Sequence, residues 1–318
     1  MMSQRDLLRD LFDAAVQAAL PKHTIKEYLP DPPKGRTIVV GCGKAAATMA
    51  KAFEECWEHP LEGIVVTPYG HIVPTKRVKV IEASHPVPDS AGMQAALNIQ
   101  ALVTNLTPDD LVVFLVSGGG SSLLTLPAKG ISLDDKKILN TKLLQCGANI
   151  REMNCVRKHV SSIKGGRLAE TIWPAQCVTL AISDIPGDDL SVIASGPTEP
   201  DETTFEEALA ILSKYHIDEP RSIIEFLTSN NPETPKPGNR IFKRIHSHLI
   251  STPQRSLEAA ATTARQHGFT PLILGDAIEG EAQEVARVLA GITKQVVRHG
   301  QPIPRPCVLL SGGETTVT

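Results

Sequence analysis

Short, uninterrupted apolar runs alternate along this chain with longer segments in which apolar residues recur at helical spacing. Apolar runs of this length predict buried strands, and the segments between them predict covering helices. The predicted strands are residues 37–40, 63–67, 78–82, 111–116 and 178–182, and the predicted helices are residues 45–58, 90–102, 133–146, 150–164 and 204–215. This alternation predicts an α/β fold with a doubly wound, mostly parallel sheet in a large N-terminal domain.

The segment 230–240, NNPETPKPGNR, concentrates residues that stop both helices and strands. We therefore predict a domain boundary there, with a Rossmann-like α/β domain over residues 1–240 and the start of a second α/β domain over 241–318. The second domain is predicted to contain a helix at 256–268, a strand at 271–274, a helix at 281–298 and a strand at 307–310. Since so few strands leave a sheet poorly covered, we expect this domain to be incomplete and the chain to be truncated.

Composition and charge exclude several classes of function for this chain. The 318 residues carry a formal net charge of -3, with 42% hydrophobic and 21% charged residues. No basic tail or aromatic-studded basic stripe is present, so we expect no nucleic acid partner. The charged N-terminal segment predicts an amphipathic helix and not a signal peptide, and no uncharged stretch predicts a membrane span. The six cysteines show no metal-ligand spacing, which favours free thiols and a cytoplasmic protein.

The run LVVFLVSGGGSSLL at 111–124 is the most informative stretch, because a strand leads directly into three glycines flanked by serines. Glycines allow the backbone to approach a ligand, and the amide groups that follow point at negative charge. The candidate anion-binding residues are Ser117, Gly118, Gly119, Gly120, Ser121 and Ser122. The alternative is a structural turn with capping serines.

A second strand leads into Gly41-Cys42-Gly43-Lys44, followed by an alanine-rich helix. The Lys44 ammonium at a helix N-terminus favours a phosphate or carboxylate group. The glycines also match the dinucleotide pattern G-x-G-x-x-A, which would indicate a hydride-transfer enzyme. The next strand opposes that interpretation, because it ends at Thr67-Pro68 without the acid that holds ribose hydroxyls. The spacing of a Walker A loop is also absent.

A basic segment lies between the glycine loop and the strand that precedes Asp184. Helical spacing would align Arg157, Ser161 and Lys164, with Lys158 on an adjacent face. Such a face can hold a phosphate or carboxylate group. The alternative is a solvated surface helix.

Acidic residues follow the strand that ends near Ile182. Asp184 comes first, with Asp188 and Asp189 in the loop beyond it. A carboxylate at the carboxyl end of a strand can bind Mg²⁺ or accept a hydroxyl proton, although an Asx turn is the alternative. His85 lies in another turn that follows a strand and is a candidate substrate contact, or a residue that only holds the loop.

Together these blocks resemble the glycerate 2-kinases that carry a C-terminal MOFRL domain. The resemblance runs from the N-terminal helix to the last residue, and it is carried by GCGKAAATMA, HPVPDSAG, VSGGGSSLL, NCVRKHVSSIKGGRLA, SDIPGDDLSVIASGPT and LLSGGETTV. It implies ATP-dependent phosphorylation of D-glycerate at the 2-hydroxyl, with Mg²⁺. It also implies that Lys44 neutralises phosphate charge, that residues 117–122 cradle substrate or phosphate, that Arg157 and Lys158 hold anionic groups, and that Asp184 is a metal ligand or base. Further candidates are Gly312, Gly313 and Glu314, in a MOFRL region that begins near residue 305.

This sequence departs from the resembled family at its end. Family members continue past SGGETTV into a segment that supplies an active-site arginine, so we expect weak turnover from this chain. An NAD(P)-dependent hydroxypyruvate reductase and a non-catalytic remnant remain the alternatives. An exposed sheet edge near Thr318 would also permit a homodimer.

Overall fold

The computed structural model describes residues 3–229 and 231–318, which form two compact units. The larger unit contains Tyr28–Ala181 and Leu190–His248, and the smaller contains Met1–Glu27, Ile182–Asp189 and Leu249–Thr318. The predicted division placed the N-terminal helix in the first domain, whereas the structure groups it with the C-terminal segment. Of the predicted boundary segment 230–240, residue 230 lies outside the described residues.

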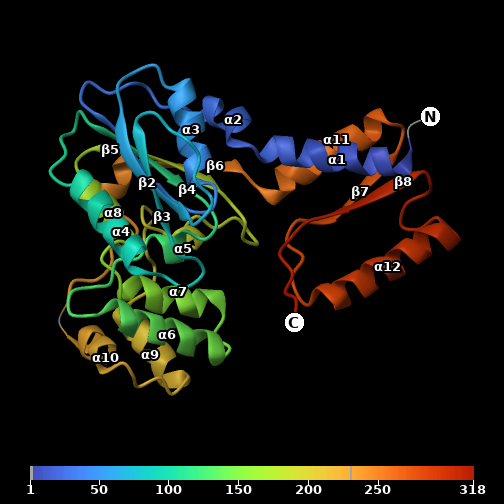
Figure 1. Cartoon of the computed structure of the whole chain (residues 1–318). Coiled ribbons are helices and arrows are strands. Elements are labelled where there is room, and N and C mark those ends of the chain that lie inside the picture. The colour runs from blue at the N-terminus through green and yellow to red at the C-terminus, as the bar shows by residue number, and fades with distance from the viewer. Residues whose placement is uncertain (1–2, 230) are drawn as a thin grey trace. The chain divides into compact units, whose positions relative to one another are not determined.

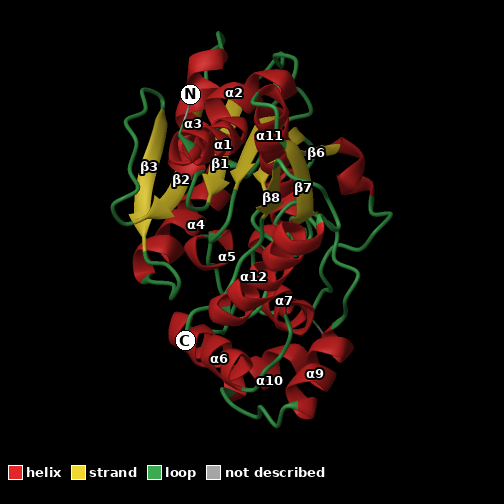
Figure 2. Cartoon of the chain, turned by 90° about the vertical axis from the view of Figure 1, so that its right-hand side faces the viewer, coloured by secondary structure: helices red, strands yellow, loops and turns green. Residues whose placement is uncertain are grey.

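The strands of the described residues form one six-stranded and one two-stranded sheet, and the six-stranded sheet has the order β3-β2-β1-β4-β5-β6 (Figures 1 and 2). Its strands are β1 (Thr37–Cys42), β2 (Glu62–Pro68), β3 (Val78–Ala83), β4 (Leu111–Val116), β5 (Gln176–Ile182) and β6 (Ile245–Ser251). The pairs β1–β2, β1–β4, β2–β3 and β4–β5 are all parallel. Every residue of β1 and β4 is buried, as continuous apolar runs require at the centre of a parallel sheet. The predicted α/β fold is confirmed.

The strand order reverses between β1 and β4. After β1 the chain builds β2 and β3 on one side, and it then crosses over to build β4 and β5 on the other. At such a reversal the loops that leave the two strands diverge, and ligands bind outside their carboxyl ends. The loops that leave β1 and β4 are those of Lys44 and the three glycines.

Helices of the larger unit fall into two groups. The first contains α3 (Ala46–Cys56) and α4 (Ser90–Leu102), which pack on the sheet, together with α5 (Gly120–Leu123) and α8 (Arg167–Ile172). The second contains α6 (Leu133–Gln145), α7 (Ile150–His159), α9 (Phe205–Lys214) and α10 (Arg221–Thr228), which enclose their own apolar core. Figure 1 shows this second group together on one side of the sheet. Short 3-10 turns lie at η1 (Ile25–Tyr28), η2 (Ile193–Ser195) and η3 (Arg240–Arg244).

The prediction of a helix over 150–164 is wrong at its C-terminal end, because α7 ends at His159. Beyond it the Ser161 hydroxyl and the Ser162 amide both donate to the carbonyl of Leu126. These bonds to a distant segment replace the helical ladder. Ser161 and Lys164 therefore do not share a helical face with Arg157.

The smaller unit is built around α1 (Gln4–Ala19), which packs on α11 (Pro253–Gln266). Leu7 and Leu11 are buried against Ala260 and Ala264, and this shared core explains why the N-terminal helix groups with the C-terminal segment. The unit also contains α2 (Pro21–Thr24), α12 (Ala282–His299) and the parallel pair β7 (Thr270–Gly275) and β8 (Cys307–Ser311). None of the helices described is long and apolar enough to cross a membrane.

Candidate functional site

The loops that follow β1 and β4 are joined by hydrogen bonds. The Lys44 amide donates to the Gly118 carbonyl at 2.8 Å, and the Ala45 amide donates to the Ser117 hydroxyl at 3.0 Å. Gly43 has a φ of +129°, and a Cβ there would lie 2.2 Å from the Ser117 Oγ. Only glycine allows this approach, so the two predicted anion loops form one continuous surface.

The glycine loop also lies against His85. Gly119 has a φ of +83°, and a Cβ there would lie 2.9 Å from His85 Cδ2 and 3.4 Å from Lys44 Cγ. The amide groups of Gly118 and Gly119 donate no hydrogen bond to any residue that the structure describes. Two backbone donors therefore remain available to a ligand, between the lysine and the histidine.

A cavity of about 300 Å³ opens beside these residues. It is lined by Lys44, Pro68, Tyr69, His71, Ser84 and His85. The Lys44 side chain is exposed, and no carboxylate of the described residues lies within ion-pair distance of its ammonium. Asp89, in contrast, caps α4 by accepting from the Gly92 amide and also accepts from the Tyr69 hydroxyl, so it holds the wall of the cavity.

The floor of the glycine loop is tightly packed. A Cβ at Gly120 would lie 2.7 Å from the Ala194 Cβ and 2.9 Å from the Cys42 Sγ. The Ser121 and Ser195 hydroxyls are 2.6 Å apart, and Ser195 Oγ donates to Asn154 Oδ1 at 3.0 Å. Ala194 and Ser195 both have positive φ, at 52° and 62°. Left-handed backbone at non-glycine residues costs of order 1–3 kcal/mol each and persists only where surrounding contacts hold it.

We expect Gly120→Ala to lower the free energy of unfolding by about 1–3 kcal/mol, because the new methyl group overpacks the contact with Ala194. Thermal unfolding followed by circular dichroism measures this loss. Gly291→Ala is the control, since a Cβ there meets no atom within 4 Å and alanine favours the helix. A Gly120→Ala protein as stable as the parent would contradict the packing described.

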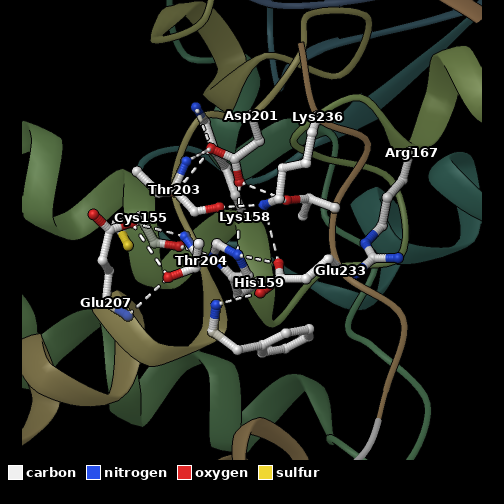
Figure 3. Close-up of polar contacts among 12 residues, drawn as sticks. Cys155, Lys158, His159, Arg167, Asp201, Thr203, Thr204, Glu207, Glu233 and Lys236 are labelled. Atoms are coloured by element: carbon white, nitrogen blue, oxygen red, sulfur yellow. Dashed lines mark hydrogen bonds and ion pairs between the residues drawn. The ribbon is translucent and has the colours of Figure 1, made fainter. Parts of the chain in front are cut away.

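The two predicted basic ligands differ in their surroundings. Arg157 Nε donates to Asn140 Oδ1 at 3.0 Å. Lys158 is buried, and its Nζ donates to Asp201 Oδ1 at 3.3 Å (Figure 3). Lys158 is thus engaged with a carboxylate of the chain itself. The prediction that it holds a substrate anion is untested, and the structure shows a competing internal partner.

Asp201 is the centre of a polar network (Figure 3). It accepts hydrogen bonds from the hydroxyls of Thr203 and Thr234, at 2.7 Å and 2.9 Å, and His159 Nε2 lies 3.8 Å from its Oδ2. Burial by itself would raise the pKa of Asp201, but the Lys158 ammonium, the Thr203 bonds and His159 together hold it below its ordinary value. Lys236 extends the network by donating to Glu233 and to the Thr203 carbonyl. The network joins the end of α7 to two loops distant in sequence.

Comparisons with known proteins agree on a family. A family model described as a domain of unknown function, DUF4147, matches residues 7–228. The D-glycerate 2-kinase of Thermotoga maritima is 40% identical over 99% of this chain and 74% of its own length. The crystal structure of the glycerate kinase of Thermotoga maritima superposes with a TM-score of 0.88, covering 98% of this chain and 74% of that one.

This chain belongs to the glycerate kinase family. A protein of Agrobacterium vitis, provisionally named hydroxypyruvate reductase, is 53% identical over the whole chain and 72% of its own length. The family resemblance drawn from the sequence blocks is therefore confirmed.

The remaining predicted residues of this glycerate kinase family member lie in the smaller unit. Asp184 is exposed two residues after β5. Asp188 has a φ of +55°, and Asp189 is exposed beside it. The Gly312 amide donates to the Gly275 carbonyl, and a Cβ at Gly313 would overlap the backbone of Ile278. Glu314 is exposed. Their ligand-binding roles stay predictions.

Sequence reasoning missed the residues that support the glycine loop in this family member. Ser195 and Asn154 contact the loop through Ser121, and neither was among the predicted site residues. The sequence did contain a sign that Ser195 lies in a turn like the glycine loop. Ser195 is followed by Gly196, and the glycine loop also starts with a Ser-Gly pair. Asn154 lies within a helical pattern whose sequence gives no indication of its partner.

Proposed function

We propose that this protein transfers the γ-phosphoryl group of ATP to the 2-hydroxyl of D-glycerate, giving 2-phospho-D-glycerate and ADP. The observation that carries this proposal is the position of Lys44 beside two unengaged loop amides, at the carboxyl ends of β1 and β4. Membership of the glycerate kinase family supports the substrate. In the reaction the hydroxyl oxygen bonds to phosphorus, the bond to the bridging β-phosphate oxygen breaks, and the hydroxyl proton is released.

We assign roles to the residues of this site from the charge of their side chains and from their positions around the cavity. The Lys44 ammonium neutralises phosphate oxygens, and the amides of Gly118 and Gly119 donate to the same group. Ser84 and His85 line the cavity next to Lys44 and contact the acceptor. Phosphoryl transfer depends on positioning and charge compensation more than on covalent chemistry, and these groups supply both.

Mg²⁺ would supply further charge neutralisation between the phosphates. The described residues contain no group of three or more His, Cys, Asp or Glu side chains able to hold a metal. Mg²⁺ in enzymes of this kind is usually bound by one or two carboxylates together with phosphate oxygens and water. Asp184 is the carboxylate to which the sequence assigns this ion.

A hydroxypyruvate reductase is the second candidate, because a relative at 53% identity carries that name. The structure supports the kinase instead. Glu62 is the first residue of β2, and the strand ends at Thr67 and Pro68. A nicotinamide site of the predicted pattern needs an acid at that carboxyl end.

A two-arm assay on the purified protein tests the proposal. One arm measures ADP release with D-glycerate, ATP and Mg²⁺, and the other measures NADH or NADPH oxidation with hydroxypyruvate. We expect ADP release that requires D-glycerate, and no hydroxypyruvate-dependent oxidation. Oxidation without glycerate-dependent ADP release would replace the kinase with the reductase.

A further inference from the structure

Two buried lysines and a half-buried arginine lie in the larger unit. Lys136 on α6 is 2% exposed, and Lys164, after α7, is 1% exposed. Arg157 on α7 donates to Asn140, which lies one helical turn from Lys136 on α6, and its charge also lowers the pKa of both lysines. Burial is the larger cause, and it brings the pKa of Lys164 down to about 7. A buried charge is costly unless it is paired, so this cluster requires an explanation.

The described part of the chain supplies no counter-charge for these cations. None of the three cations forms an ion pair with a carboxylate of the described residues. Lys164 Nζ donates to the Ala194 carbonyl at 3.2 Å, and Arg157 Nε donates to Asn140. Lys136 Nζ is buried and has no hydrogen-bond partner among residues 3–229 and 231–318. The arrangement contrasts with Lys158, whose charge is matched by Asp201.

A fourth donor is also unsatisfied. Asn154 is 4% exposed, and its Nδ2 has no hydrogen-bond partner in the described part of the chain, although its Oδ1 accepts from Ser195. Buried amide groups are nearly always paired, and an orphaned one indicates a missing acceptor. Lys136 and Asn154 are thus two of several orphaned donors in the larger unit, and no carboxylate of the described residues pairs with either. Asn154 lies one helical turn before Arg157 on α7.

The cluster lies directly behind the glycine loop. Ala194 packs against Gly120 on one side, and its carbonyl accepts from Lys164 on the other. The hydroxyl pair Ser121–Ser195 continues to Asn154. Cys42, which ends β1, also lies against Gly120. The turn that contains Ala194 and Ser195 therefore separates the loop from the cations.

We propose that Lys136, Lys164 and Arg157, with the Asn154 amide, form an internal binding site for a small oxyanion, a carboxylate or phosphate group of a substrate. The inference rests on the proposed function for the identity of that substrate. An oxyanion accepts several charge-assisted hydrogen bonds at once, so it satisfies the orphaned donors and the uncompensated charge together.

Lys136→Met tests the site, because methionine keeps the length of the side chain and removes the ammonium. The control is Lys137→Met, the neighbouring residue on α6, whose ammonium pairs with Asp134 at the surface. Thermal unfolding of each full-length protein is measured alone, with inorganic phosphate and with D-glycerate. Lys164→Met is the second variant if Lys136→Met does not fold.

We expect the parent and Lys137→Met proteins to be stabilised by at least one of the two anions. Lys136→Met should be more stable than the parent without anion, and its affinity for that anion should fall roughly tenfold or more. Loss of the D-glycerate response alone identifies a carboxylate site, and loss of the phosphate response identifies a phosphate site. Anion responses in Lys136→Met equal to those of the parent would overturn the proposal, as would a parent that responds to neither anion.

The kinase assay separates this inference from the proposed function. Glycerate-dependent ADP release together with unchanged anion responses in Lys136→Met would reject the internal site and keep the kinase. No ADP release together with a lost phosphate response would reject the kinase and keep the internal site.

Discussion

Replacing Lys44 with alanine is expected to lower kcat/KM for D-glycerate phosphorylation by roughly 10²–10³-fold, the usual effect of removing one preorganised electrostatic contact to a reacting group. The ammonium has no carboxylate partner among the described residues, so its charge is available to a phosphate group. The coupled ADP-release assay measures the change. Because the side chain is exposed, the variant should fold as the parent does.

Lys51→Ala is the matched control for this experiment. Lys51 lies on α3, the helix that follows Lys44, and Glu55, at 4.0 Å, is the one described residue with which its half-exposed side chain pairs. Its removal should leave kcat/KM within about twofold of the parent, since exposed pairs of this kind contribute little. Equal activity of the two variants would remove Lys44 from the proposed site.

Replacing Asp201 with asparagine is expected to destabilise the larger unit by about 3–5 kcal/mol, because the buried Lys158 ammonium then loses its only carboxylate within ion-pair distance among the described residues. Asparagine keeps the shape and can still accept from Thr203, but its amide nitrogen replaces the oxygen that accepts from Thr234, so the loss reports the charge together with that hydrogen bond. Urea unfolding followed by the fluorescence of Trp57 and Trp173 measures it, since both tryptophans lie in this unit.

Asp134→Asn provides the comparison, because the Asp134 side chain is 85% exposed and its pair with Lys137 is a surface pair. We expect Asp134→Asn to lower the free energy of unfolding by at most about 1 kcal/mol. Similar losses in the two variants would show that Asp201 does not stabilise Lys158.

The destabilisation caused by Asp201→Asn should become smaller as the pH falls. The folded-state pKa of Asp201 lies below the ordinary value of 3.8, so its ionised form stabilises the folded chain above that value. The stabilisation is lost as the pH falls through the folded-state pKa. The deficit of Asp201→Asn should therefore be full near neutral pH and shrink progressively below about pH 4. A deficit that grows on acidification would contradict the assignment.

Much of the larger unit could be predicted because its signals are local. Two elements have the bounds that were predicted for them, the strand over residues 111–116 and the helix over residues 90–102. The strand is marked by an apolar run and the helix by the Asp89 cap, and each of these signals extends over only a few residues. The glycines in the loops of Lys44 and Ser117 could be predicted for the same reason. Each loop turns sharply, and the turn itself requires glycine. The family could be recognised from the same short blocks.

The sequence by itself therefore determined the α/β class, the two glycine-containing loops that follow β1 and β4, and the family. The tertiary structure alone decided which charges are satisfied, because partners come from segments far apart in the chain. Lys158 pairs with Asp201, which lies 43 residues further along the chain, whereas Lys136 has no partner among the described residues. It also decided that α7 ends at His159 and that α1 packs on α11. Helical periodicity describes one segment at a time, and only the folded chain shows which segments compete for the same hydrogen bonds or share one core.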